Sequence, residues 1–195
     1  MPTSIPALVS EIVELRRRAG ATDMQLGTPA TPARIRAAEQ KRHTRFPPSY
    51  RQFLKLHNGW IGFWPDWSLL GVGGKITDEM RRDVRESLEL AKSAVENDAE
   101  MDDRDPREAW RELEQQERRR RNVVHPLKHP VLGTNFNGGL LLFDRNRIWN
   151  REPEVVAIQN GQFQERWKNF ESLLRAARAD LRAEAAPGRA PSRKG

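Results

Sequence analysis

Apolar residues recur with helical spacing in the first third of the chain. Residues 5–19 carry the first such pattern, and Gly20 is suited to end it. Thr31 followed by Pro32 is typical of a helix N-cap with proline in the first turn. A second helix is therefore expected from there to about Arg42.

A third, shorter helix is predicted between two sharp boundaries. Pro47 and Pro48 are tolerated only before a helix or in its first turn, and Asn58 and Gly59 can end one. Between these boundaries one face is formed by Tyr50, Phe53, Leu54 and His57. A helix of this length is marginal in water by itself, so its apolar face is expected to lie in the core.

After the third helix the pattern changes to that of strands and turns. Residues 60–74 read as one or two short strands interrupted by glycines. Residues 140–143 and 155–158 are apolar enough for buried strands. Asn160-Gly161 predicts a hairpin turn to a partner strand over residues 162–167.

Residues 77–122 interrupt the strands with two charged helices and are interpreted as a helical insert. Thr77 is expected to cap the first helix, over 78–97, and the second is expected over about 106–121. A thin apolar stripe on the first helix comprises Met80, Val84, Leu88, Ala91 and Val95. An acidic break separates the two helices.

An amphipathic helix beginning near Phe170 completes the folded part of the chain. Antiparallel hairpins with helices at both ends argue for an α+β fold and against an alternating βαβ fold. We therefore predict one domain over residues 1–181, with the insert at 77–122. A basic tail rich in Pro, Gly and Ser, residues 182–195, is expected to be disordered.

Composition adds a charge asymmetry to this picture. The 195-residue chain carries a net charge of +7, yet the insert is acidic, with fifteen Asp and Glu against eleven Lys and Arg. The acidic insert and the basic remainder would favour different partners. The chain has no cysteine, no apolar run long enough for a membrane span and no signal-peptide charge order, so a cytoplasmic location is expected.

Candidate catalytic and metal-binding chemistry is sparse. His125 and His129 have the spacing of helical metal ligands, but Pro126 and Pro130 break any helix there. The acidic break lacks the glycine and the last glutamate of a calcium loop. The glycine-rich stretches lack the Lys-Ser/Thr of a phosphate loop, and no Gly-x-Ser-x-Gly elbow occurs. The sequence therefore predicts a non-enzyme without metal or cofactor.

Large aromatic residues gather in one short segment, at Trp60, Phe63, Trp64 and Trp67. Because side chains alternate along a strand, these four cannot all face one side of a regular strand. Tryptophan is common both in cores and at interface hot spots, so about half are expected in the core and the rest at a partner contact. The densest basic run, Arg118 to Arg121, lies apart from them, so nucleic-acid binding is not the expected main function.

Two blocks of the sequence carry a family resemblance. The first comprises Ile35 and Glu39 on a helix, the segment Phe46-Pro47-Pro48-Ser49-Tyr50-Arg51-Gln52-Phe53-Leu54, and Asn58-Gly59. The second comprises Gly133 to Gly139, Leu140 to Asp144, Val155 to Ile158, and Phe170 with Leu173-Leu174. Together they resemble the SUKH superfamily, which includes yeast cell-wall synthesis regulators and many bacterial toxin-immunity proteins. Trp60 stands where the family commonly has a second glycine, and the insert is longer than the usual connection.

The resemblance implies an α+β fold with helices packed on one side of a mainly antiparallel sheet. It also implies a non-catalytic protein that neutralises a cognate bacterial toxin by direct protein–protein binding. The alternative is a regulatory or scaffolding module like the cell-wall regulators. The expected partner-contact residues are Trp60, Trp64 and Trp67 from the aromatic segment, and Asp102, Asp103 and Asp105, which would face a basic toxin.

Overall fold

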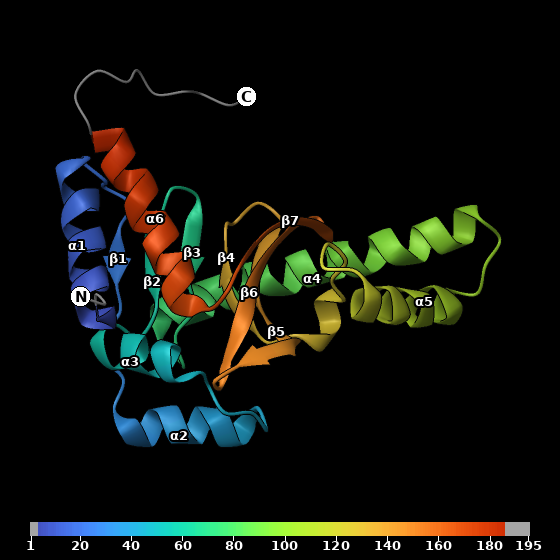
Figure 1. Ribbon diagram of the computed structural model, residues 1–195, viewed down its shortest axis with the longest axis horizontal. Coiled ribbons are helices and arrows are strands. Elements are labelled where there is room, and N and C mark those ends of the chain that lie inside the picture. The colour runs from blue at the N-terminus through green and yellow to red at the C-terminus, as the bar shows by residue number, and fades with distance from the viewer. Residues whose placement is uncertain (1–3, 186–195) are drawn as a thin grey trace.

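A single antiparallel sheet organises the protein in the computed structural model, which describes residues 4–185 (Figure 1). Its seven strands lie in the order in which they occur along the chain, so each pairs with its sequence neighbour. They are β1 (Gln25–Leu26), β2 (Trp60–Trp64), β3 (Trp67–Leu69), β4 (Val131–Thr134), β5 (Gly139–Trp149), β6 (Glu152–Gln159) and β7 (Gln162–Trp167). With the helices below, this arrangement confirms the predicted α+β class.

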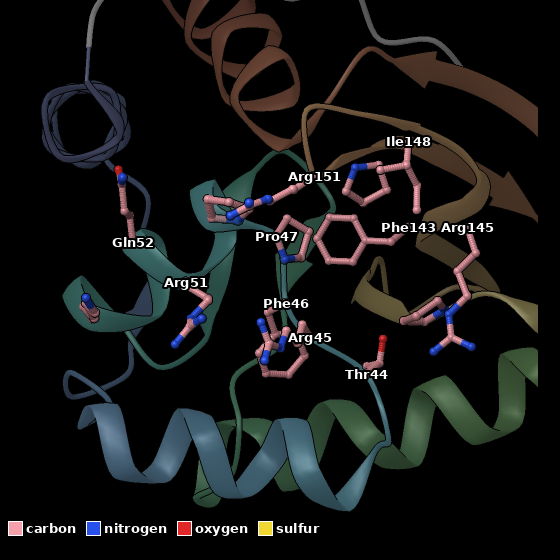
Figure 2. Close-up of a pocket in the computed structure, with 14 residues that line it drawn as sticks. Thr44, Arg45, Phe46, Pro47, Arg51, Gln52, Phe143, Arg145, Ile148 and Arg151 are labelled. Atoms are coloured by element: carbon pink, nitrogen blue, oxygen red, sulfur yellow. The ribbon is translucent and has the colours of Figure 1, made fainter.

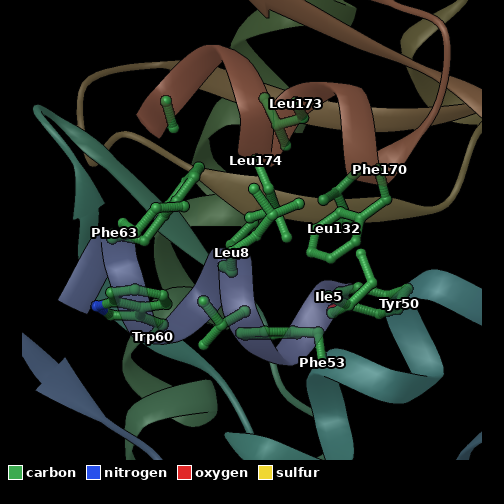
Figure 3. Close-up of a cluster of buried hydrophobic side chains, with 14 of the residues drawn as sticks. Ile5, Leu8, Tyr50, Phe53, Trp60, Phe63, Leu132, Phe170, Leu173 and Leu174 are labelled. Atoms are coloured by element: carbon green, nitrogen blue, oxygen red, sulfur yellow. The ribbon is translucent and has the colours of Figure 1, made fainter. Parts of the chain in front are cut away.

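One face of the sheet is covered by helices from both ends of the chain. They are α1 (Ile5–Arg18), α3 (Pro48–Leu56) and α6 (Phe170–Ala185). Their apolar faces meet the sheet in a large core that includes Leu8, Tyr50, Phe53, Trp60 and Phe170 (Figure 3). The helix α2 (Pro32–Lys41) contacts α3 at the periphery of this layer.

The insert covers the opposite face of the sheet. Its first helix, α4 (Lys75–Met101), contacts β4 and β5 and contributes Met80 and Val84 to a second core. The second helix, α5 (Pro106–Arg119), folds back beside α4, and both extend past the sheet (Figure 1). A short 3-10 turn, Pro126–Lys128, leads from the insert into β4.

The central strands alternate between these two cores. Leu141 and Phe143 of β5 face the first core, whereas Leu140 and Leu142 face the second. A strand buried on both faces has an unbroken apolar run, which is why Leu140 to Phe143 lacks the alternation of a half-exposed strand.

Most of the sequence-based elements are confirmed, although β5 continues to Trp149, past the expected 140–143, and α3 ends at Leu56, before His57. Thr31 caps α2 by accepting a hydrogen bond from the Arg34 amide at 3.3 Å. Tyr50, Phe53 and Leu54 are all buried on α3. Asn160 and Gly161 both have positive φ, as a two-residue hairpin turn between β6 and β7 requires.

Thr77 does not cap the insert's first helix. The helix begins at Lys75, after Gly74, so Thr77 lies inside the first turn and its hydroxyl donates to the Gly73 carbonyl at 3.4 Å. The residues just before the helix are held instead by Asn58, whose side chain accepts from the Val72 amide and donates to the Gly73 carbonyl, each at 2.7 Å. Such a long-range constraint cannot be read from local capping rules.

The predicted tail boundary also moves. Residues 182–185 belong to α6, whose last turn is tied to α1 by the ion pairs of Arg178 and Arg182 with Glu11. The remainder of the expected tail, residues 186–195, lies outside the described residues. Within residues 4–185 no helix has both the length and the apolar character needed to cross a membrane.

The packing of α3 gives a direct stability test. Phe53 has no exposed surface and contacts the rings of Tyr50 and Phe170. Phe53→Ala is expected to lower the free energy of unfolding by about 3–5 kcal/mol, as for other buried aromatic residues. A reversible denaturant melt measures this, with the exposed neighbour Gln52→Ala as the control. A loss below about 1 kcal/mol would contradict the packing described here.

Candidate partner-binding surface

A wide irregularity in β5 shapes the surface beside α3. Asp144 pairs with Glu154 and Ile148 pairs with Pro153. Between these two pairs β5 therefore contains three more residues than β6, which is a bulge. The extra residues are 145–147, and they bend the strand away from its ladder. Their backbone amides must find partners outside the sheet.

Two of these amides are bound by side chains. The Arg145 amide donates to Nδ1 of His129 at 3.1 Å, and the Asn146 amide donates to Asp144 Oδ1 at 2.9 Å. Since Nδ1 of His129 accepts, the ring proton lies on Nε2, which is 2.7 Å from Glu117 Oε1. His129 is thus a buried connector between α5 and the irregular part of β5.

Glu117 is the centre of this arrangement. Its carboxylate, on α5, is buried and accepts hydrogen bonds from the His125 amide at 2.7 Å, from His129 and from the Asn146 side chain at 3.0 Å. Three donors around one carboxylate offset the cost of burying its charge. The insert is therefore tied to the sheet through polar contacts as well as through apolar packing.

Asp144 forms the second half of the same network. Its buried carboxylate lies 2.5 Å from the Arg166 guanidinium, which also contacts Glu154 at 3.0 Å and donates to the Arg121 carbonyl at 2.7 Å. We call Glu117, His129, Asp144, Asn146 and Arg166 the buried polar junction. It fixes both the insert and the direction in which β5 leaves the core.

Beyond the junction, β5 and β6 form a projecting hairpin tip, residues 148–151. Asn150 and Arg151 have φ values of 51° and 65°, which is the geometry of a tight hairpin turn. Ile148 and Trp149 retain 59% and 68% of their surface exposed. Exposed apolar residues are common singly, but two adjacent ones on a well-anchored turn mark a contact candidate.

The base of the hairpin is clamped to α3. Glu152 accepts hydrogen bonds from the Ser49 amide at 2.8 Å and from the Ser49 hydroxyl at 2.6 Å. Pro47, at the N-cap position of α3, has no side chain that could do this, so Glu152 caps the helix from a distant strand.

Between the hairpin and α3 lies a cleft of about 590 Å³. Its apolar surface includes Phe46, Pro47, Phe143 and Pro153. Its cationic residues are Arg45, Arg51, Lys55, Arg145 and Arg151. Figure 2 shows Arg45 and Arg51 on one side, Arg145 and Ile148 on the other, and Pro47 and Phe143 between them. We call this feature the cationic cleft.

Most of the positive charge in the cleft is not neutralised within the part of the chain that the structure describes. Arg45, Lys55, Arg145 and Arg151 form no ion pair with any carboxylate of residues 4–185. Arg51 lies 3.6 Å from Glu39, whose carboxylate also accepts from the Phe46 amide at 2.9 Å. Glu39 thus holds the segment before α3 in place and offsets only one of the five cations.

The aromatic residues expected at a partner contact divide between core and surface. Trp60 and Phe63 are fully buried, whereas Trp64 and Trp67 are half-buried. Gly62, with a φ of 66°, interrupts β2 and lets Trp60 and Phe63 face the same core despite their odd spacing. A side chain without exposed surface cannot touch a partner, so Trp60 is a core residue rather than a contact residue.

The acidic residues expected at a partner contact lie at the far end of the insert. Asp102 is paired with Arg104 at 2.8 Å, Asp103 has a φ of 52°, and Asp105 caps α5 through the Arg107 amide at 2.9 Å. We call residues 102–105 the acidic loop. Figure 1 places it at the opposite end of the molecule from β2 and β3, so the six expected residues do not form one surface.

The hairpin tip and the cleft were not among the residues expected from sequence. Asn150 and Arg151 between two strand-like segments hint at a turn, and Trp149 beside three arginines hints at a contact. What the sequence hides is that the bulge directs these side chains outward. The bulge that precedes the tip is held by partners as distant as Glu117.

The two histidines considered as metal ligands have other roles. His129 bridges Glu117 and the Arg145 amide, and the His125 ring lies 4.8 Å from the Trp110 ring. Among residues 4–185, no three His, Asp or Glu side chains gather in a way that could hold a metal ion.

The protein is thus an α+β domain with a cleft and a projecting hairpin on its surface. A comparison with protein families identifies the domain further: the family model described as SMI1 / KNR4 family (SUKH-1) matches residues 29–176. The chain therefore belongs to the SUKH family, whose members are generally non-catalytic. No curated protein sequence matches the chain. The matched region includes the whole cationic cleft and the insert, and it leaves out α1.

The packing of His125 predicts a pH-dependent stability. Burial lowers the pKa of His125, helped by the nearby charge of Lys128. As pH falls, the histidine of the unfolded chain is protonated at a higher pH than that of the folded chain. The contribution of neutral His125 to the free energy of unfolding is therefore fully present above the unfolded pKa of about 6.5 and is lost as pH decreases below it. His125→Phe keeps a ring against Trp110 and removes this titration. We expect its denaturation midpoint to change less than that of the wild type between about pH 7.5 and pH 5.5.

His57, whose pKa burial also lowers, contributes to the wild-type loss and remains in the variant. The exposed Gln52→Ala serves as the control and should keep the wild-type pH dependence. Equal losses in His125→Phe and the wild type would show that His125 does not carry the effect.

Proposed function

We propose that the protein neutralises a cognate bacterial toxin by direct protein–protein binding, without catalysis of its own. The observation that carries this proposal is the hairpin tip, where Ile148 and Trp149 stand exposed beside the cationic cleft. Membership of the SUKH family supports a binding role, and the tip supplies a surface suited to one.

The tip has the composition and the rigidity of an interface hot spot. Tryptophan and arginine are enriched among residues that dominate binding energy, and here Trp149 is flanked by Arg147 and Arg151. The junction below the tip and the Glu152 clamp beside it restrict its motion, so little entropy is lost on binding. A stable complex buries about 1,600 Å² in total, so the tip and cleft would form the centre of a larger contact.

The acidic loop offers a second surface for the same function. A basic toxin would be repelled by the net positive remainder of the chain and attracted to Asp102, Asp103 and Asp105. These carboxylates are exposed, so they would act mainly on the rate of encounter. The half-buried Trp64 and Trp67, on either side of the β2–β3 turn, remain further candidates.

The first test removes the exposed indole. Trp149→Ala is expected to raise the dissociation rate of a complex with the toxin encoded beside this gene by about tenfold or more, as for a hot-spot tryptophan. Surface plasmon resonance on the co-purified pair measures it. Leu90→Ala is the matched control, since Leu90 is an apolar residue of the insert with 56% of its surface exposed.

Two results would contradict the proposal. If Trp149→Ala leaves the dissociation rate unchanged while Leu90→Ala raises it, the interface lies on the insert and not at the hairpin tip. No complex with any neighbouring gene product at any salt concentration would overturn toxin neutralisation and favour a regulatory or scaffolding module.

The second test separates the acidic loop from the tip. Replacing Asp102, Asp103 and Asp105 with Asn should slow association with a basic toxin severalfold at low salt, and less at physiological salt, where screening acts beyond about 8 Å. Asn at position 105 can still cap α5, so the folded state is retained. Neutralising three exposed carboxylates elsewhere, Glu14, Asp66 and Asp180, is the control. If both triple variants slow association equally, the net charge of the protein and not the position of the acidic loop determines the association rate.

A further inference from the structure

We propose that the cationic cleft binds a short acidic segment of the protein partner, in which Asp or Glu side chains adjoin apolar ones. This inference rests on the proposed function and adds the chemistry of the partner's contacting segment. It follows from the charges, the apolar surface and the rigidity of the cleft.

The charges converge on the cleft from different elements. Arg145 and Arg151 come from the β5–β6 hairpin, Arg45 from the segment before α3, and Arg51 and Lys55 from α3. Four of these five cations form no ion pair within residues 4–185. Guanidinium groups bind carboxylates through paired hydrogen bonds, so an acidic side chain entering between the walls can meet several donors.

The surface between the charges is apolar. Pro48 and Ile148 keep exposed surface there and Pro130 is half-buried, above a floor formed by the buried Phe46 and Phe143. A free anion or a sugar-phosphate backbone gains little from such a surface, whereas an aliphatic or aromatic side chain next to a carboxylate gains from burial. The combination therefore favours a peptide segment.

The aromatic rings of the cleft argue against single-stranded nucleic acid. Phe46 and Phe143 have only 5% and 4% of their surface exposed, and Arg42 lies over the Phe46 ring at 5.5 Å. Neither ring can offer an open face for base stacking, which such ligands use along the strand. Trp149 stands outside the cleft at the tip, so it provides one such face at most.

Hydrogen bonds fix the positions of the cleft walls in the protein without a ligand. Glu152 joins the hairpin to α3 through Ser49, and Glu39 holds the Phe46 amide. Arg145 follows directly from the junction, where His129 fixes its amide. A preformed cleft pays little reorganisation cost and can select a short linear motif.

A random peptide library displayed on phage tests this inference without knowledge of the toxin. The library is selected against the full-length protein, and enriched peptides are synthesised and measured by fluorescence polarisation. We expect a motif with Asp or Glu next to Leu, Ile, Phe or Trp. The variant Arg145→Glu/Arg151→Glu should weaken binding by about tenfold or more, as for lost charge-assisted hydrogen bonds. Arg85→Glu/Arg107→Glu, with the same charge change on the insert, should bind as the wild type.

Circular dichroism melts of the variants exclude unfolding as the cause. Peptides without acidic residues, no enriched peptides, or acidic peptides that bind Arg145→Glu/Arg151→Glu equally well would each overturn the inference. So would oligo(dT) that binds the cleft more tightly than any selected peptide. None of these results would affect toxin neutralisation itself, because the dissociation test at Trp149 uses the toxin and not the peptides.

Discussion

The buried carboxylate of Glu117 is the contact that joins the insert to the sheet beneath the hairpin tip. It joins the insert to the sheet by accepting from the His125 amide, from His129 and from Asn146. These donors belong to the turn before β4 and to the irregular part of β5, so one charge holds three segments in register. Without it, His129, which accepts from the Arg145 amide, and the Asn146 side chain would each lose their contact with the insert. The hairpin tip and one wall of the cleft would then lose their fixed positions.

This dependence changes how the insert is understood. An acidic helical pair between two strands suggests an appendage, yet α4 closes the second core and α5 completes the polar junction. The apolar contacts of α4 are non-directional, whereas the hydrogen bonds of Glu117 and Asp144 are directional and select one docking geometry. The insert therefore acts as a second structural layer, on the face of the sheet opposite α1, α3 and α6.

A structural feature could be predicted from the sequence when the residues that determine it lie close together in the chain. The α3 face and the Asn160-Gly161 turn were predicted correctly because their signals lie within a few residues. The cap of α4 was misplaced because the segment that leads into it is held by Asn58, a side chain fourteen residues earlier than Val72. Trp60 was placed at a contact because the bulge at Gly62 was not foreseen. The cleft escaped prediction altogether, since its walls meet only through long-range contacts such as Glu152 with Ser49.

The cap that Glu152 provides to α3 has a consequence for biosynthesis. Glu152 and Ser49, whose amide it binds, are 103 positions apart in the sequence. Likewise, α1 at the start of the domain packs on α6 at its end. As the ribosome extends the chain, α3 and its apolar face emerge long before the strand that caps them. Non-local contacts of this kind slow folding and leave apolar surface exposed in the nascent chain. A chain that ends before Glu152 therefore lacks both the cap of α3 and part of the cleft wall.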